Sequence, residues 1–295
     1  SLPPIRTRVD KRGLAAALLL VGLLVGGCGP AGRDDTGGLA LTVTRDFGRG
    51  VLDSAHLAKV PDGATALGLA RSQSDVPISG PGWSVFVNGL RLESSPAAFE
   101  LSPGDRVQWD RPSSAQRARA RAIVGAFPEP FRHGFRGERR PVRVECDDTD
   151  AAPCGDAKQA LDDVGVPTSG SSLGAPGTEH VTRLVVAQWP AARIVRGAFT
   201  LEDGPERNGI FARFSSDGKT LGLLDQDGAV ARTVHAGDGT ALIVALRPRA
   251  EELVWLVTAL DAPGLAAGVR ALRGDRLRNA YAVAVTGRTV EKLPL

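Results

Sequence analysis

The chain has 295 residues, a length that suffices for two ordinary domains with apolar cores of their own. Its 36 Lys and Arg residues exceed its 33 Asp and Glu residues, but four of these basic groups and one acid fall within residues 1–27. The rest of the chain therefore carries 32 groups of each sign. Because the basic excess belongs to the N-terminus, it does not support nucleic-acid binding, and no nucleic-acid partner is expected.

Residues 1–28 are typical of an export signal that ends in a lipid-attachment site. A basic start precedes the apolar run GLAAALLLVGLLV at residues 13–25, which is too short for a stable membrane-spanning anchor. Two glycines and Cys28 follow this run. The pattern resembles the lipobox of bacterial lipoproteins, whose cysteine thiol receives fatty acids such as palmitate and becomes the new N-terminus. An ordinary cleaved signal and an uncleaved anchor are the alternatives.

A lipoprotein of this kind would be held by its lipid anchor at the extracytoplasmic face of the cell membrane. Residues 29–38, GPAGRDDTGG, are polar and rich in glycine. Such a composition predicts a flexible tether between the anchor and the first domain.

Residues 39–112 predict a small domain in which two strands, a helix and further strands follow one another. Residues 61–70, PDGATALGLA, predict the helix, and Asn88-Gly89 joins two apolar runs. Because type I′ turns need positive φ at both central residues, Asn-Gly in this position predicts a two-residue hairpin. The strands are expected in the segments LALTV, VLDSAHLAKV, WSVFV, LRL, AFEL and RVQW.

The sequence GW-x-VFVNG from Gly82, followed by L-x-PGDRV-x-W up to Trp109, carries a family resemblance. It resembles a bacterial domain of unknown function related to the C-terminal domain of transcobalamin and intrinsic factor. The resemblance covers about residues 39–112 and implies a β-grasp-like fold. The eukaryotic relatives bind cobalamin, so the resemblance also implies a corrinoid ligand. The chain is further similar to uncharacterised two-part actinobacterial lipoproteins, in which the motif FPEPF, here residues 127–131, joins the parts.

The hairpin at residues 83–92 is the expected binding surface of this domain. Period-2 alternation places Trp83 and Phe86 on opposite faces, and we expect only one of these faces to be buried. The exposed aromatic edge would cover a flat apolar ligand, and the turn would offer polar groups. The candidate ligand-binding residues are Trp83, Phe86, Asn88 and Trp109, and packing is the alternative role of each aromatic side chain.

Residues 113–140 form an Arg-rich connecting segment. Ten arginines fall between residues 106 and 143, and seven acids with one lysine occupy the stretch 145–163. Neighbouring blocks of opposite charge indicate solvated faces or an intramolecular salt-bridge seam. Binding of an anionic lipid or a cell-envelope polymer is the alternative.

Cys146 and Cys154 are the only cysteines besides Cys28. In an exported chain this close pair predicts a disulfide that closes a short loop, with two free thiols as the alternative. A zinc site would need further His or Cys ligands at suitable spacing, and the surrounding sequence has none.

Residues 141–295 predict a mixed α/β domain. Two nearly continuous apolar runs, at 241–246 and 253–260, are expected to be buried strands. Further strands are expected at 142–146, 181–189, 209–214, 221–225, 229–234 and 281–285, and helices at 156–165, 190–198 and 261–274. The expected fold class is therefore α+β, with an N-terminal β-grasp-like domain followed by a C-terminal mixed α/β domain.

The sequence motifs do not favour an enzyme. The G-x-S-x-G match around Ser172 lies in the Pro/Gly/Ser-rich stretch 166–178, whereas a nucleophile elbow needs a strand-to-helix turn. DGKT at 217–220 lacks the first glycine of a P-loop, and the acids at 147–150 lack the glycine and distal glutamate of an EF-hand. No catalytic residue, metal site or resident cofactor is expected.

The sequence thus favours an exported, lipid-anchored protein that binds a small molecule, with a corrinoid suggested by the resemblance. A structural or protein-interaction adaptor, with subunits of an envelope transporter as its partners, is the alternative. An enzyme within the α/β domain is the third hypothesis.

Cys28→Ser should abolish acylation, because the proposed lipid is attached to this thiol. We expect the variant to lose incorporation of labelled fatty acid and to be released from the membrane or mislocalised. Equal labelling of the variant and the wild-type protein would exclude Cys28 as the lipidation site.

Overall fold

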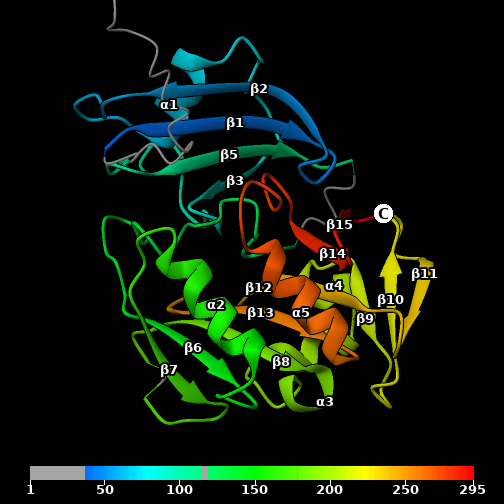
Figure 1. Cartoon of the computed structure of the whole chain (residues 1–295). Coiled ribbons are helices and arrows are strands. Elements are labelled where there is room, and N and C mark those ends of the chain that lie inside the picture. Colours follow the sequence, from blue (N-terminus) through cyan, green and yellow to red (C-terminus); the bar gives the residue numbers. More distant parts are fainter. Residues whose placement is uncertain (1–36, 114–118, 178) are drawn as a thin grey trace, which may run out of the picture. The chain divides into compact units, whose positions relative to one another are not determined.

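The computed structural model describes residues 37–113, 119–177 and 179–295. The expected export signal, Cys28 and most of the tether at 29–38 lie outside these residues. All described residues belong to one structural unit, which contains three β-sheets (Figure 1). Within the described ranges, no helix is long and apolar enough to cross a membrane.

The N-terminal part is a five-stranded sheet, at the top of Figure 1, with helix α1 (Ala66–Gln73) on one face. The strand order is β2-β1-β5-β3-β4, and β1 and β5 run parallel while the other neighbours are antiparallel. The strands are β1 (Leu39–Arg45), β2 (Gly50–Leu57), β3 (Ser84–Val87), β4 (Leu90–Arg91) and β5 (Arg106–Arg111). Asn88 and Gly89 have φ values of 52° and 77°, which confirms the two-residue hairpin.

The C-terminal part is built on a seven-stranded sheet of order β15-β14-β12-β13-β8-β6-β7. The strands from β13 to β7 in this order run parallel, and the others are antiparallel. The strands are β6 (Val142–Cys146), β7 (Thr168–Ser172), β8 (Thr182–Gln188), β12 (Thr240–Arg249), β13 (Glu252–Ala259), β14 (Ala282–Thr286) and β15 (Thr289–Leu293). The helices and mixed sheets confirm the α+β class.

Both faces of the seven-stranded sheet are covered, as its apolar strands predict. Along β12, Ala241, Ile243 and Ala245 pack in one core with helices α2 (Ala152–Asp162) and α5 (Ala262–Ala271). The residues between them, such as Val244, pack in a second core on the opposite face. The elements of that second side are α3 (Trp189–Ala192), the 3-10 helix η1 (Ala198–Glu202), α4 (Pro205–Asn208), β9 (Ala212–Phe214), β10 (Thr220–Leu224) and β11 (Val230–His235).

The structure corrects four local expectations. The segment AFEL, expected to be a strand, is not one, and Glu100 within it forms an isolated bridge with Thr65. The segment 166–178, expected to be a loop, contains the edge strand β7, which pairs only with β6 among the described strands. The helix expected at 190–198 is replaced by the short α3 and η1, with Gly197 in the left-handed region between them. Strand β15 was not expected. The predicted disulfide between Cys146 and Cys154 is confirmed, and it joins the end of β6 to the first turn of α2.

A buried carboxylate connects the two main sheets. Asp110 of β5 accepts hydrogen bonds from the Thr44 hydroxyl at 2.7 Å, the Gly48 amide at 3.0 Å and the Tyr281 hydroxyl at 3.0 Å. Tyr281 lies directly before β14 of the other sheet. Its ring packs at 5.3 Å from the rings of both Phe47 and Phe86. The seam between the sheets is therefore an apolar core with one acid hydrogen-bonded inside it.

Gly48 lets the backbones of the two parts approach each other closely. A Cβ atom at this position would lie 1.7 Å from the carbonyl oxygen of Asn279, and the φ of +78° already favours glycine. Gln108 donates to the same Asn279 carbonyl at 3.1 Å, and Lys292 donates to the Gly48 carbonyl at 2.9 Å. No larger residue at position 48 would preserve this contact without a backbone shift.

Burial raises the pKa of Asp110 above its ordinary value of 3.8, although the hydrogen bonds from Thr44, Gly48 and Tyr281 oppose the rise. The folded protein therefore holds a proton on Asp110 more tightly than the unfolded chain does. This contribution to the free energy of unfolding is present at low pH and is lost as the pH rises from 3.8 through the raised pKa.

Asp110→Asn should remove this pH dependence while keeping the size and the principal acceptor of the side chain. The stability of the wild-type protein relative to the variant should fall as the pH rises from 3.8 through the raised pKa of Asp110, measured by chemical denaturation. Burial also raises the pKa of Asp105, but this group is common to both proteins, so its effect cancels in the difference. A relative stability that rises over the same interval would contradict the assignment.

Candidate functional site

The hairpin proposed from the sequence as a binding surface has both faces buried. Phe86 is 1% exposed and packs on Tyr281, while Trp109 is buried in the core beneath α1. Trp83 is half-buried, with its ring 6.2 Å from that of Trp109. The expectation that only one face is buried is wrong, because the C-terminal sheet covers the face that carries Phe86. Packing is thus the observed environment of Phe86 and Trp109.

Asn88 is fully buried and uses its amide inside the protein. Its Nδ2 donates to Asp105 at 2.7 Å and to the carbonyl of Gly134 at 2.8 Å. Its Oδ1 accepts from the amide of Arg106 at 2.8 Å. Asn88 is therefore a positioning residue that holds the loop at Gly134 against the hairpin, and a ligand contact is not open to it.

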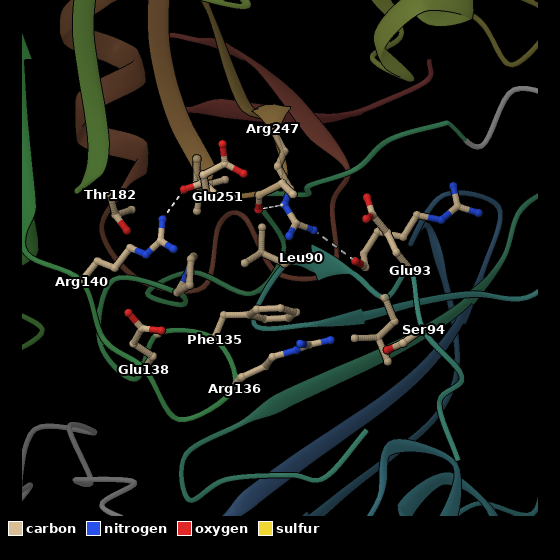
Figure 2. Close-up of a pocket in the computed structure, with 16 residues that line it drawn as sticks. Leu90, Glu93, Ser94, Phe135, Arg136, Glu138, Arg140, Thr182, Arg247 and Glu251 are labelled. Atoms are coloured by element: carbon tan, nitrogen blue, oxygen red, sulfur yellow. Dashed lines mark hydrogen bonds between the residues drawn. The ribbon is translucent and has the colours of Figure 1, made fainter. Parts of the chain in front are cut away.

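The loop held by Asn88 forms one wall of a cavity of about 390 Å³ beside the hairpin (Figure 2). Residues 90–94 and the turn between β12 and β13 form the other walls. The apolar part of the lining consists of Leu90, Leu92, Pro130, Phe135, Ala250 and Leu253. The charged part consists of Arg91, Arg136, Arg140, Arg247, Glu93, Glu138 and Glu251. The sizes and chemistry of these side chains suit a small amphipathic ligand.

A second tight turn places Arg136 at this cavity. Phe135 and Glu138 exchange backbone hydrogen bonds of 3.0 and 3.1 Å, and Arg136 and Gly137 have φ values of 58° and 71°. This is the type I′ geometry, which glycine or asparagine adopts most readily. A left-handed arginine is therefore unfavourable for the backbone, and it points to a role of the side chain at the cavity.

The ring of Phe135 lies between two guanidinium groups, as Figure 2 shows. The Cζ atoms of Arg136 and Arg247 are 5.8 and 5.7 Å from its centroid, within the range of cation–π attraction. Arg136 also lies 5.7 Å from the ring of Phe99. These aromatic contacts orient the two cations without neutralising their charge.

Arg247 is held in place by protein carbonyls. It donates to the carbonyl of Ala250 at 2.8 Å and to that of Arg91 at 3.4 Å. Burial lowers its pKa; Glu93 raises this pKa, and the nearby guanidinium groups, including Arg136 and Arg140, lower it. An anion in the cavity would offset the free-energy cost of burying this cation. It would also reduce the repulsion between Arg247 and the neighbouring guanidinium groups.

The carboxylates of the lining balance these cations only in part. Glu93 pairs with Arg121 at 2.7 Å, and this hydrogen bond lowers the pKa of the carboxyl. Arg140 donates to the backbone carbonyl of Glu251, so this contact leaves its charge unneutralised. The lining includes no histidine or cysteine. The arrangement can bind and orient an anion.

A half-buried histidine next to a buried glutamate forms a contact within the same loop. His133 Nδ1 lies 2.6 Å from Glu129 Oε1, and the His133 amide donates to Glu129 Oε2 at 2.8 Å. No pattern in the sequence predicted this pair, because i, i+4 spacing brings side chains together on a helix, and residues 129–133 form turns. Among the described residues, no group of three or more His, Cys, Asp or Glu side chains could hold a metal ion.

The motifs considered for catalysis lie elsewhere. Ser172 is at the end of the edge strand β7, and DGKT at 217–220 forms the turn between β9 and β10. No protein-family model matches the chain, and no curated protein matches it either. The function is therefore inferred from the geometry of the cavity.

Asn88→Gly should destabilise the protein although glycine suits the φ of this turn. The change leaves Asp105, the Gly134 carbonyl and the Arg106 amide without their shared partner, which should cost about 1–3 kcal/mol in the free energy of unfolding. Chemical denaturation measures this loss. Arg136→Gly, the same change in the other type I′ turn, is the control and should be neutral or slightly stabilising. Equal effects of the two substitutions would contradict the role given to the amide.

Proposed function

We propose that this chain is a non-enzymatic binding protein that takes a small anion with an apolar part in the cavity beside the 83–92 hairpin. The observation that carries the proposal is the pair of guanidinium groups, Arg136 and Arg247, on either side of the Phe135 ring. A carboxylate can accept two parallel hydrogen bonds from one guanidinium group, while the aromatic and leucine side chains contact the rest of the ligand.

The volume of the cavity bears on the kind of ligand. About 390 Å³ lies near the lower end of the range for sites that enclose drug-sized molecules. A complete corrinoid is larger, so only part of it would be enclosed. We therefore place a smaller organic anion before the corrinoid that the family resemblance suggests. The strand order β2-β1-β5-β3-β4 with α1 on one face supports a β-grasp-like description of residues 39–112.

The proposed location is the extracytoplasmic face of the membrane, with Cys28 as the lipidated residue. The sequence of residues 1–28 supports this location. The disulfide between Cys146 and Cys154 also supports it, because structural disulfides form and persist in oxidising compartments.

Thermal denaturation of the full chain in detergent tests the proposal. Aryl and alkyl carboxylates, each paired with its uncharged amide, should raise the melting temperature only as the anion, because binding to the native state stabilises it by mass action. Cyanocobalamin is included as the corrinoid probe. A panel in which no anion stabilises the protein more than its amide would overturn the proposal.

Arg136→Gly should weaken the binding of the stabilising carboxylate by about tenfold or more, because it removes a charge-assisted contact. Isothermal titration calorimetry measures the affinity. Arg288→Gly is the matched control, because Arg288 is an exposed arginine in the two-residue turn between β14 and β15 and does not line this cavity. The control should bind as tightly as the wild-type protein, and an equal loss in both variants would indicate a general effect of charge.

A further inference from the structure

A second cavity, of about 370 Å³, is lined by six arginines and by no aspartate or glutamate. The connecting segment, η1 with its flanking turns, α4 and the end of β12 contribute to it. The six arginines are Arg119, Arg121, Arg196, Arg207, Arg247 and Arg249. So many guanidinium groups around one cavity repel one another and create a strongly positive potential inside it.

Two of these arginines are fixed in place by acceptors of the protein. Arg121 pairs with Glu93 at 2.7 Å and donates to the carbonyl of Arg247 at 3.2 Å. Arg247 in turn donates to the carbonyls of Ala250 and Arg91. Backbone carbonyls hold a guanidinium group without cancelling its charge, so Arg247 remains a fixed cation at the cavity wall.

The remaining arginines differ in how closely carboxylates approach them. Arg196 lies 3.7 Å from Glu252, and Arg119 donates to the backbone carbonyl of Glu206. Within the part of the chain that the structure describes, Arg207 and Arg249 have no carboxylate at ion-pair distance. Both are exposed, so their side chains can reach a ligand at the mouth of the cavity.

Exposed apolar side chains lie beside these cations. Phe199 lines the cavity and is 54% exposed, and Ile194, in the preceding turn, is 71% exposed. A ligand with an anionic group and an attached apolar group would meet both kinds of surface. A phosphoryl group suits the anionic part better than a carboxylate, because it offers more oxygens and up to two charges to several guanidinium forks.

We propose that the six-arginine cavity binds the phosphoryl group of an amphipathic ligand, with Phe199 against the apolar part of that ligand. The two sites can be tested separately, because Arg247 is the one residue that lines both cavities and the other lining residues differ. A soluble phosphate ester and an anionic lipid headgroup present the same chemistry, and two arms of one experiment distinguish them.

In the first arm, calorimetry of the full chain in detergent measures the binding of pyrophosphate. In the second arm, the full chain carrying Cys28→Ser, which has no acylation site at position 28, is sedimented with vesicles of phosphatidylcholine alone or mixed with phosphatidylglycerol. Binding of pyrophosphate alone assigns the cavity to soluble phosphates, and preference for phosphatidylglycerol vesicles assigns it to headgroups. Either result supports the proposal only if it depends on the arginines of the cavity.

The double variant Arg207→Gln with Arg249→Gln tests whether binding depends on the arginines of the cavity. Neither residue has an ion pair to lose, so the fold should be retained, and circular dichroism checks this. In whichever arm the wild-type protein shows binding, we expect the affinity of this double variant to be lower by about tenfold or more. The matched control, Arg270→Gln with Arg288→Gln, removes two exposed arginines that line neither cavity and should bind as the wild-type protein does.

Arg136→Gly should also leave pyrophosphate and vesicle binding unchanged, whereas it weakens carboxylate binding. Failure of this proposal is therefore distinguishable from failure of the proposed function. No binding in either arm would overturn the proposal, as would an equal loss of binding in the test pair and the control pair.

Discussion

The hydrogen bond from Tyr281 to the buried carboxylate of Asp110 is the constraint on which the rest of the structure depends. It fixes the strand β5 of one sheet to the start of β14 in the other, and it fixes their relative position because a buried acceptor must be satisfied. This hydrogen bond lies in apolar surroundings formed by the rings of Phe47, Phe86 and Tyr281. These surroundings raise the free-energy cost of breaking the hydrogen bond. An apolar contact alone would tolerate sliding of the sheets, whereas this bond does not.

The cavity beside the hairpin follows from this fixed arrangement, because residues 90–94 line it together with Arg247 and Leu253 of the C-terminal sheet. Segments that lie far apart in the sequence meet at the edge of the seam, and each contributes arginines whose charges face the same space. The backbone positions are held by contacts that involve no ligand, such as the amide of Asn88 on the Gly134 carbonyl. The cavity beside the hairpin is therefore preorganised, which lowers the conformational entropy that a ligand would have to overcome on binding.

The sequence contained the local part of this information. Alternation identified most strands, Asn88-Gly89 identified a hairpin, and the spacing of Cys146 and Cys154 identified the disulfide. The same alternation could not tell that both faces of the 83–87 strand are covered, because the covering residue Tyr281 is almost two hundred positions away. The juxtaposition of Arg136 and Arg247 was unpredictable for the same reason. The left-handed backbone conformation of Arg136 was not predictable either, because neither composition nor periodicity indicates it.

Arg247 is the one arginine that lines both cavities, and this has a thermodynamic consequence. An anion in either cavity would lower the positive potential at Arg247 and thereby weaken the attraction that the other cavity exerts on a second anion. The two sites would then show negative cooperativity. Linkage requires the effect to be reciprocal, so each ligand would reduce the affinity for the other by the same factor.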